Sequence, residues 1–325
     1  MCKADNKLDT EKCLPEKLPY RKISLSVDRQ VKQLQSRGMV INNPSGVEEL
    51  LKHVSYYHLE AYFYSYYKDP KENHKFDEGV KFSNIWRDYR FDRRFREHLS
   101  HALERIEVSV KTQFVYHLSQ NYGAFPIQRE HFKNMPNEEW DNLVKYLSGV
   151  DPENREVFTK HLRRNYSIEI LPIWALVELL SFGKISLMIA YISKRDIRKA
   201  FQDTYGIDYD LFKKWMDHLR VVRNLCAHHL RLWNRRFITA PAIPRSIDDP
   251  YKALWVRPIQ YKLENNPFNE HRVYNTIVMI DYFLSKISPD NSWRKDIAVL
   301  IKKYKVDVAR MGFPQNWEND KFWGL

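Results

Sequence analysis

Apolar residues recur at three- and four-residue steps along most of the chain, the spacing of helices that bury one face. The longest such run predicts a helix over about residues 83–120 that ends at Asn121-Tyr122-Gly123. A second long helix is expected over about residues 208–236. Because no run alternates apolar and polar residues as a strand would, we predict an all-α fold, a helical bundle with these two long helices as its spine.

Shorter helices are expected before and after the spine. Val27, Val31 and Leu34 lie at helical spacing and precede Gly38, a residue type that commonly ends helices. Residues 45–68 predict one or two further helices that are rich in tyrosine. The remaining helices are expected at residues 137–148, 152–165, 172–192, 194–204, 270–286 and 291–304.

We divide the chain into three expected parts. Residues 1–78 form an N-terminal helical segment with a loose start, residues 79–290 form the helical core, and residues 291–325 form a C-terminal helix with an aromatic tail. Residues 240–268 are rich in proline and lack periodicity, so we expect them to be an extended excursion from the core.

Composition narrows the class of protein. Nine glycines in 325 residues argue against turn-dense β folds and glycine-rich nucleotide-binding folds. The net charge is +12, which favours a polyanionic partner, and nucleic acid more than a membrane surface. Three cysteines without a C-x-x-C pair cannot form a disulfide framework, the N-terminus has no apolar leader, and no window is long and apolar enough to span a membrane. We therefore expect a cytoplasmic protein.

Candidate chemistry lies on the helix expected to end near residue 236. On a helical wheel, one side is apolar and is expected to face the core, and the opposite side is polar. The apolar side contains Trp215, Leu219, Val222, Cys226, Leu230, Trp233 and Phe237. The polar side contains Asp217, Arg220, Asn224, His228, Arg231 and Arg235, with Arg223 on its flank. A solvated face is one interpretation, but arginine suits phosphate and histidine exchanges protons near neutral pH, so a functional face is the other.

These residues and their neighbours allow other interpretations. The spacing Arg-x4-His also occurs at Arg93/His98 and Arg96/His101, so the spacing alone is uninformative. His98, His101 and Glu104 share a helix face but lack a fourth ligand, and we expect neither a metal nor a cofactor. Cys226 is expected to be a buried structural thiol. His229, at the border of the apolar side, is a second candidate for the working imidazole, but a structural hydrogen bond is the favoured interpretation of this residue.

At Arg223-Asn224-x-x-x-His228 the sequence resembles the R-N-x(3)-H signature of HEPN domains, all-α proteins that are often metal-independent ribonucleases. The wider sequence resembles the Abi-like family, the AbiD/AbiF group of bacterial abortive-infection proteins. The matching blocks are Val54–Leu59, Tyr89–Arg96, Ala102–Glu107, Arg223–His229 and Met311–Pro314 with Trp317. His58 departs from the pattern, because an arginine is expected after the tyrosine pair.

The resemblance implies a HEPN-like helical core and an antiphage endoribonuclease that needs no metal. Arg223 and His228 would be catalytic, with Asn224 orienting His228, while Arg220, Arg231 and Arg235 would bind RNA phosphates. It also implies a homodimer, in which two copies of the motif form one composite site, and a restraining partner, either a small structured non-coding RNA or an acidic protein. The alternative is a non-catalytic RNA-binding or regulatory protein that uses the same basic groove.

Overall fold

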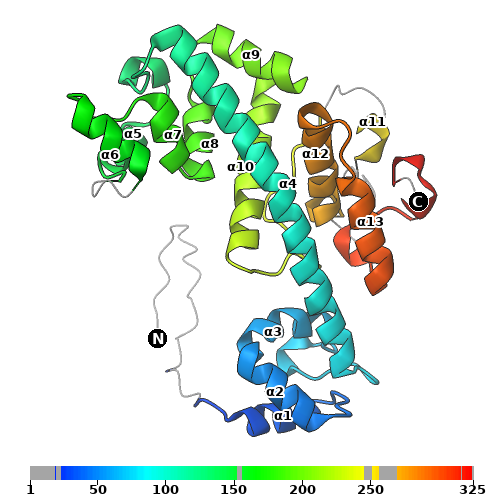
Figure 1. Cartoon of the computed structure of the whole chain (residues 1–325). Helices are drawn as coiled ribbons and strands as arrows, with labels where there is room; N and C mark the ends of the chain where they lie inside the picture. Colours follow the sequence, from blue (N-terminus) through cyan, green and yellow to red (C-terminus); the bar gives the residue numbers. More distant parts are fainter. Residues whose placement is uncertain are drawn as a thin grey trace, which may run out of the picture.

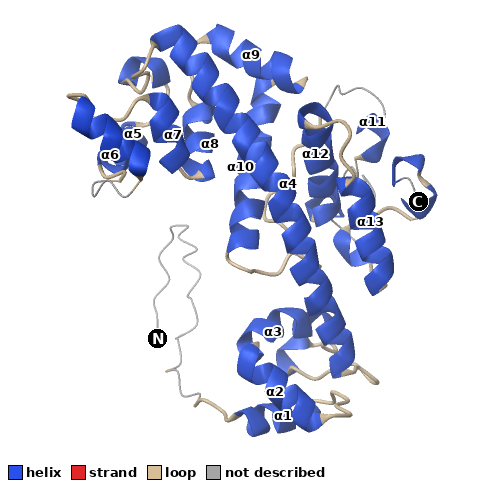
Figure 2. Cartoon of the chain, in the orientation of Figure 1, coloured by secondary structure: helices blue, strands red, loops and turns tan. Residues whose placement is uncertain are grey.

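The computed structural model describes residue 19 and residues 23–151, 156–244, 251–255, 269–315 and 317–323. Within these residues the secondary structure is helical, and the extended backbone forms isolated bridges, Val40 with Lys81 and Tyr67 with Phe76, but no strand (Figure 2). The prediction of an all-α fold is confirmed. Most of the expected excursion at 240–268, Cys2, Cys13 and the loose N-terminal residues lie outside the described residues.

One helix, α4 (Phe82–Tyr122), runs through the whole molecule, and the other helices are arranged along it (Figure 1). It has 41 residues, and its bounds confirm the helix expected over 83–120. It ends at Gly123, whose φ of 75° suits a residue without a side chain. The apolar residues that recur along this helix at three- and four-residue steps are fully buried: Phe95, Leu99, Leu103, Ile106, Val110, Phe114 and Leu118.

Two groups of helices lie at opposite ends of α4 (Figure 1). The group at its N-terminal end consists of α1 (Val27–Ser36), α2 (Pro44–His53) and α3 (Tyr56–Phe63). The group at its C-terminal end consists of α5 (Asn137–Ser148), α6 (Val157–Asn165), α7 (Ile173–Leu179), α8 (Phe182–Ala190) and α9 (Arg195–Tyr205). The single helix expected over 172–192 is thus two helices, because Ser181 caps the start of α8 by accepting a hydrogen bond from the N–H of Lys184.

The middle of α4 packs against α10 (Tyr209–Ala227), α12 (Val273–Ile287) and α13 (Trp293–Tyr304). Residues 273–284 of α12 are all buried, so this helix has no solvent face over most of its length. The short helix α11 (Tyr251–Leu254) lies beside it (Figure 1). In the C-terminal tail the rings of Phe313, Trp317 and Trp323 pack against one another.

The helix expected to reach residue 236 ends at Ala227, and that part of the prediction is wrong. His229 adopts the left-handed conformation with φ of 57°. Its N–H donates to the carbonyl of Cys226 (3.1 Å) and the N–H of Leu230 donates to that of Leu225 (2.9 Å). This is the Schellman pattern, with histidine where glycine is usual. Leu230 is consequently exposed instead of lying on the buried side of a longer helix.

Candidate site at the C-terminal end of α10

The residues of the R-N-x(3)-H motif lie at the last turns of α10 and the residue after it. Asn224 and His228 are exposed, and the N–H of His228 donates to the carbonyl of Asn224 (2.9 Å). Arg223 is half-exposed, and its Nε lies 3.6 Å from Oε2 of Glu107 on α4. The structure therefore presents an imidazole and an amide to solvent and directs the guanidinium of Arg223 towards α4.

A buried carboxylate on α4 fixes the turn that follows the motif. Asp92 accepts hydrogen bonds from the backbone N–H groups of Leu232 (3.1 Å) and Trp233 (2.6 Å). It also accepts one from the hydroxyl of Tyr62 (2.7 Å) and pairs with Arg96 at 2.5 Å. Burial raises the pKa of the Asp92 carboxyl, and Arg96 together with these hydrogen bonds opposes the shift. The chain after His228 is thereby attached to the middle of the molecule at a fixed point.

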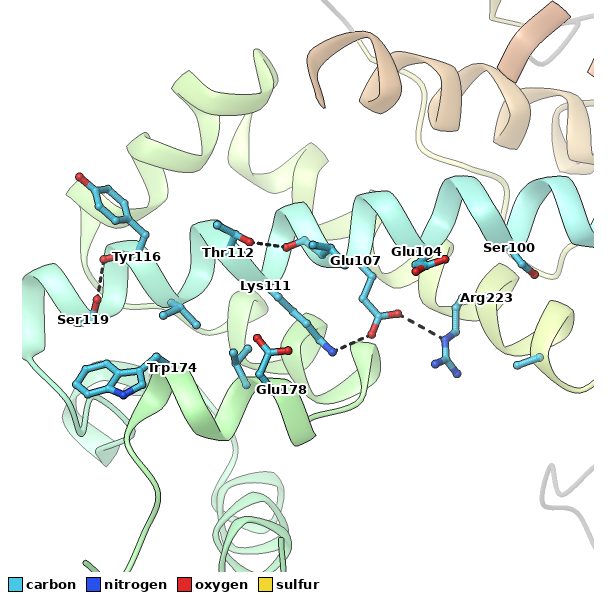
Figure 3. Close-up of a pocket in the computed structure, with 14 residues that line it drawn as sticks. Ser100, Glu104, Glu107, Lys111, Thr112, Tyr116, Ser119, Trp174, Glu178 and Arg223 are labelled. Carbon is cyan, nitrogen blue, oxygen red and sulfur yellow. Dashed lines mark hydrogen bonds and ion pairs between the residues drawn. The ribbon is translucent and has the colours of Figure 1, made fainter. Parts of the chain in front are cut away.

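A cavity of about 790 Å³ lies beside Arg223, between α4, α7 and α10 (Figure 3). In it, Glu107 lies between Arg223 and Lys111, whose Nζ is 3.0 Å from Oε1 of Glu107. Glu104 and Glu178 also line the cavity. Arg223 thus lines a cavity that contains three carboxylates and one further cation, Lys111.

The three arginines expected to bind phosphate have different environments. Arg220 is partly exposed on α10, and its Nη2 lies 2.6 Å from Asp217. Arg231 and Arg235 are not on α10; the guanidinium of Arg231 donates to the carbonyls of Trp233 and Asn234, and that of Arg235 donates to the carbonyl of Arg231. Burial lowers the pKa of both. The structure therefore groups Arg220 with Asn224 and His228 and places the other two beyond the turn.

Sequence reasoning missed the anchoring role of Asp92, although a signal was present. Asp92 and Arg96 are charged residues four positions apart on the buried side of α4, and an opposite pair at this spacing inside an apolar stripe indicates a structural ion pair.

His58 is the residue at which the sequence departs from the pattern that it resembles, because an arginine is expected there. In the structure its ring lies 5.8 Å from that of Tyr89. Burial lowers the pKa of His58, and the positive charges of Arg96 and His229 act in the same direction. The α3 residue that departs from the pattern is therefore close to the turn that carries the motif.

The buried thiol and the possible metal ligands were the other candidates for chemistry. Cys226 is buried, and burial raises its pKa to about 11, as expected for a structural thiol. Among the described residues, no group of three or more histidine, cysteine, aspartate or glutamate side chains is arranged to hold a metal ion. Within the same part of the chain, no helix combines the length and apolar composition needed to cross a membrane.

The chain was also compared with known proteins. The sequence pattern of the family described as Abi-like protein matches residues 49–234, more than half of the chain. The matched region begins in α2, contains α4 and α10, and ends at the turn fixed by Asp92. No curated protein and no solved structure matches.

Proposed function

Because the chain belongs to the Abi-like protein family, we propose that it is an abortive-infection defence protein that cleaves RNA with arginine and histidine side chains and without a metal ion. The damaged RNA would halt growth of the infected cell. Arg223 and His228 are the proposed catalytic residues, with Asn224 orienting His228.

The observation that best supports this function is the placement of His228. It is exposed at the end of a helix whose other side is buried, and the chain after it is fixed by Asp92. An imidazole in this position contributes little to packing and is available to a ligand. An imidazole can exchange protons, and the guanidinium of Arg223, near the end of the same helix, can bind phosphate.

The proposed reaction uses the 2′-hydroxyl that distinguishes RNA from DNA. An imidazole takes the proton from the 2′-hydroxyl, whose oxygen attacks the adjacent phosphorus. The guanidinium of Arg223 stabilises the charge that develops on the phosphoryl oxygens. A second imidazole donates a proton to the departing 5′-oxygen, which leaves a 2′,3′-cyclic phosphate.

One chain supplies one His228, so the second imidazole is proposed to come from a second copy. Because His228 and Asn224 face solvent and not their own core, a two-fold axis near the end of α10 would bring two such pairs together. The proposed active form is therefore a homodimer with a composite site.

Growth and cleavage assays test the enzyme proposal. Expression in bacteria is expected to slow growth, and His228→Ala is expected to relieve the defect because it removes the imidazole. The matched control is His161→Ala, an exposed histidine on α6, which should remain toxic. Purified protein should cleave RNA in the presence of EDTA. Equal toxicity of wild type and His228→Ala at matched expression would contradict the proposal.

The second candidate function is RNA binding without cleavage. It is favoured by the fact that Arg223, the proposed catalytic cation, already pairs with a carboxylate of the protein. In that case wild-type protein and His228→Ala would bind RNA equally and neither would cleave it.

A restraining partner is also proposed, because a toxic nuclease must be held inactive before infection. The net charge of +12 favours a small structured RNA over a protein. Protein purified from its native host should contain a discrete RNA, seen as a high ratio of absorbance at 260 to that at 280 nm that falls after a high-salt wash. An acidic polypeptide in its place would contradict this partner.

A further inference from the structure

A second basic surface lies on α4 and α13, outside the motif on α10. Two adjoining cavities of about 250 and 540 Å³ share Trp86, Arg90, Lys303 and Tyr304 in their walls. We call their combined surface the α4–α13 groove. The cations that line it are Arg87, Arg90, Arg93, Arg94, Lys303 and Lys305.

Basic side chains in this groove outnumber acidic ones. In the part of the chain that the structure describes, no acidic side chain lines either cavity. Arg93 and Arg94 share one carboxylate, Glu97, and Arg87 pairs with the buried Asp88. Within the described residues, no ion pair is found for Arg90, Lys303 or Lys305, all of which are exposed. Six cations therefore meet two carboxylates, and the excess favours an extended anionic ligand.

Aromatic rings lie among these cations. Trp86 and Tyr89 stack with ring centroids 5.1 Å apart, and Tyr304 packs edge-on against the buried Phe91 at 5.9 Å. Because these contacts fix the rings, a flat ligand group can stack on them at a small cost in side-chain entropy. Cations with interleaved aromatic rings are typical of surfaces that bind single-stranded nucleic acid.

Contacts connect the groove to the turn that carries the motif. Tyr89 lines the groove, and its ring also lies 5.7 Å from that of Tyr62. Tyr62 donates to Asp92, which in turn holds the N–H of Trp233. Arg90 is exposed and Asp92 is buried on the other side of α4, so the groove is connected to the segment that follows His228 through Tyr89 and Tyr62.

We propose that the α4–α13 groove binds single-stranded RNA, with the phosphates on Arg90 and Lys303 and a base on the exposed aromatic surface. This inference rests on the proposed RNA substrate and names where that substrate is held outside the catalytic motif. Backbone contacts of this kind give affinity without sequence preference. The groove would supply binding, and the motif on α10 would supply the chemistry.

The test compares two double charge reversals in a His228→Ala background, which prevents cleavage during the measurement. One variant carries Arg90→Glu and Lys303→Glu. The control carries Lys160→Glu and Arg164→Glu on exposed positions of α6, with the same change in net charge. Fluorescence anisotropy with a labelled single-stranded RNA is expected to show binding at least tenfold weaker for the groove variant and less than threefold weaker for the control.

The salt dependence gives a second readout. The slope of log affinity against log salt should fall by roughly 1.4 in the groove variant, because each lost phosphate contact contributes about 0.7 on a single strand. Arg90→Gln with Lys303→Gln, which avoids new negative charge, should show the same direction, and a thermal melt checks that each variant is folded.

The outcomes separate this inference from the proposed function. If protein with His228 intact cleaves RNA but the groove and control variants bind equally, the groove assignment is wrong and the nuclease proposal stands. If the groove variant loses binding and no protein cleaves RNA, the groove assignment stands and the nuclease proposal is wrong. If inorganic polyphosphate of equal charge competes as well as RNA, the groove is a general anion site and the assignment to RNA is wrong.

Discussion

Arg223 pairs with a carboxylate and is also the proposed catalytic cation. Its ion pair with Glu107 is long, at 3.6 Å, and the side chain is half-exposed, so this pair holds the guanidinium weakly. A phosphate that approaches His228 can therefore recruit Arg223 without a large cost. Glu107 remains paired with Lys111 when Arg223 moves.

Replacing Arg223 with lysine tests this interpretation. Lysine keeps the charge but lacks the planar fork that binds two phosphoryl oxygens. We expect cleavage to fall about 100-fold while RNA affinity changes less than about threefold, measured by single-turnover cleavage and by anisotropy. An Arg223→Lys protein with full cleavage activity would show that Arg223 is an ordinary surface cation.

Asp92 is the polar residue on which the position of the motif depends. Asp92→Asn places an amide nitrogen against donors, and it leaves the buried Arg96 without its counter-ion. We expect the free energy of unfolding to fall by about 3–5 kcal/mol, the usual cost of breaking a buried ion pair. Urea denaturation measures this. The control is Asp217→Asn, an exposed acid on α10, which should change stability by less than about 1 kcal/mol.

His218 makes the fold sensitive to acid. It is buried on α10, its Nε2 lies 2.8 Å from the hydroxyl of Thr276, and burial lowers its pKa to about 4. The unfolded state, with a pKa near ~6.5, binds the proton first, so this contribution to stability is complete above about pH 6.5 and is lost as pH falls to about 4. The loss amounts to about 3 kcal/mol.

The effect of His218 is isolated by comparison with His218→Gln, which keeps a hydrogen-bonding group but does not titrate. Between pH 6.5 and 4, the free energy of unfolding of wild type should fall more steeply than that of the variant. Parallel curves would mean that folding does not lower the pKa of His218.

At the scale of the element, the end of α10 gives two adjacent exposed histidines different backbone conformations. His229 occupies a left-handed position that disfavours a side chain, whereas His228 has ordinary backbone angles. His229→Gly is therefore expected to stabilise the protein by about 0.5–1 kcal/mol, seen as a higher melting temperature. Toxicity should persist in this variant. Loss of toxicity with a stable fold would identify His229 as the working imidazole.

The helices were largely predictable from apolar periodicity, whereas the end of α10 was not. α4, α5 and α9 lie within two residues of their expected bounds, because each has one buried side and a clear stop signal. Beyond Ala227, however, Trp233 and Phe237 are buried as a longer helix would require, although the chain there forms a turn. Apolar periodicity indicates which residues are buried, but it does not show whether those residues lie in a helix or in a turn.

The candidate site shows the same limit. Exposure of Asn224 and His228 followed from the helical wheel, since both lie opposite the buried side of α10. The positions of Arg231 and Arg235 did not, because they depend on backbone N–H groups held by a carboxylate about 140 residues away in sequence. Long-range polar contacts of this kind leave no local pattern.

At the scale of the whole molecule, the excess of cations is unevenly distributed. Among the described residues, no carboxylate lines the α4–α13 groove, while the cavity beside Arg223 is lined by three carboxylates, Glu104, Glu107 and Glu178, and by two cations, Lys111 and Arg223. A polyanion is therefore attracted to the N-terminal half of α4 more than to this cavity.

Because α4 is one continuous helix, it fixes the distance between the groove and the residues near Arg223. Arg90 and Glu107, the partner of Arg223, lie on the same unbroken helix, about 25 Å apart along its axis. An RNA that reaches both the groove and Arg223 must therefore exceed a minimum length. A fragment shorter than this length contacts only one of the two surfaces. Cleavage that shortens the RNA below this length would then lower the affinity of the protein for the products. Affinity measured over a series of RNA lengths should rise in a step and not smoothly, and a smooth rise would show that the two surfaces bind independently.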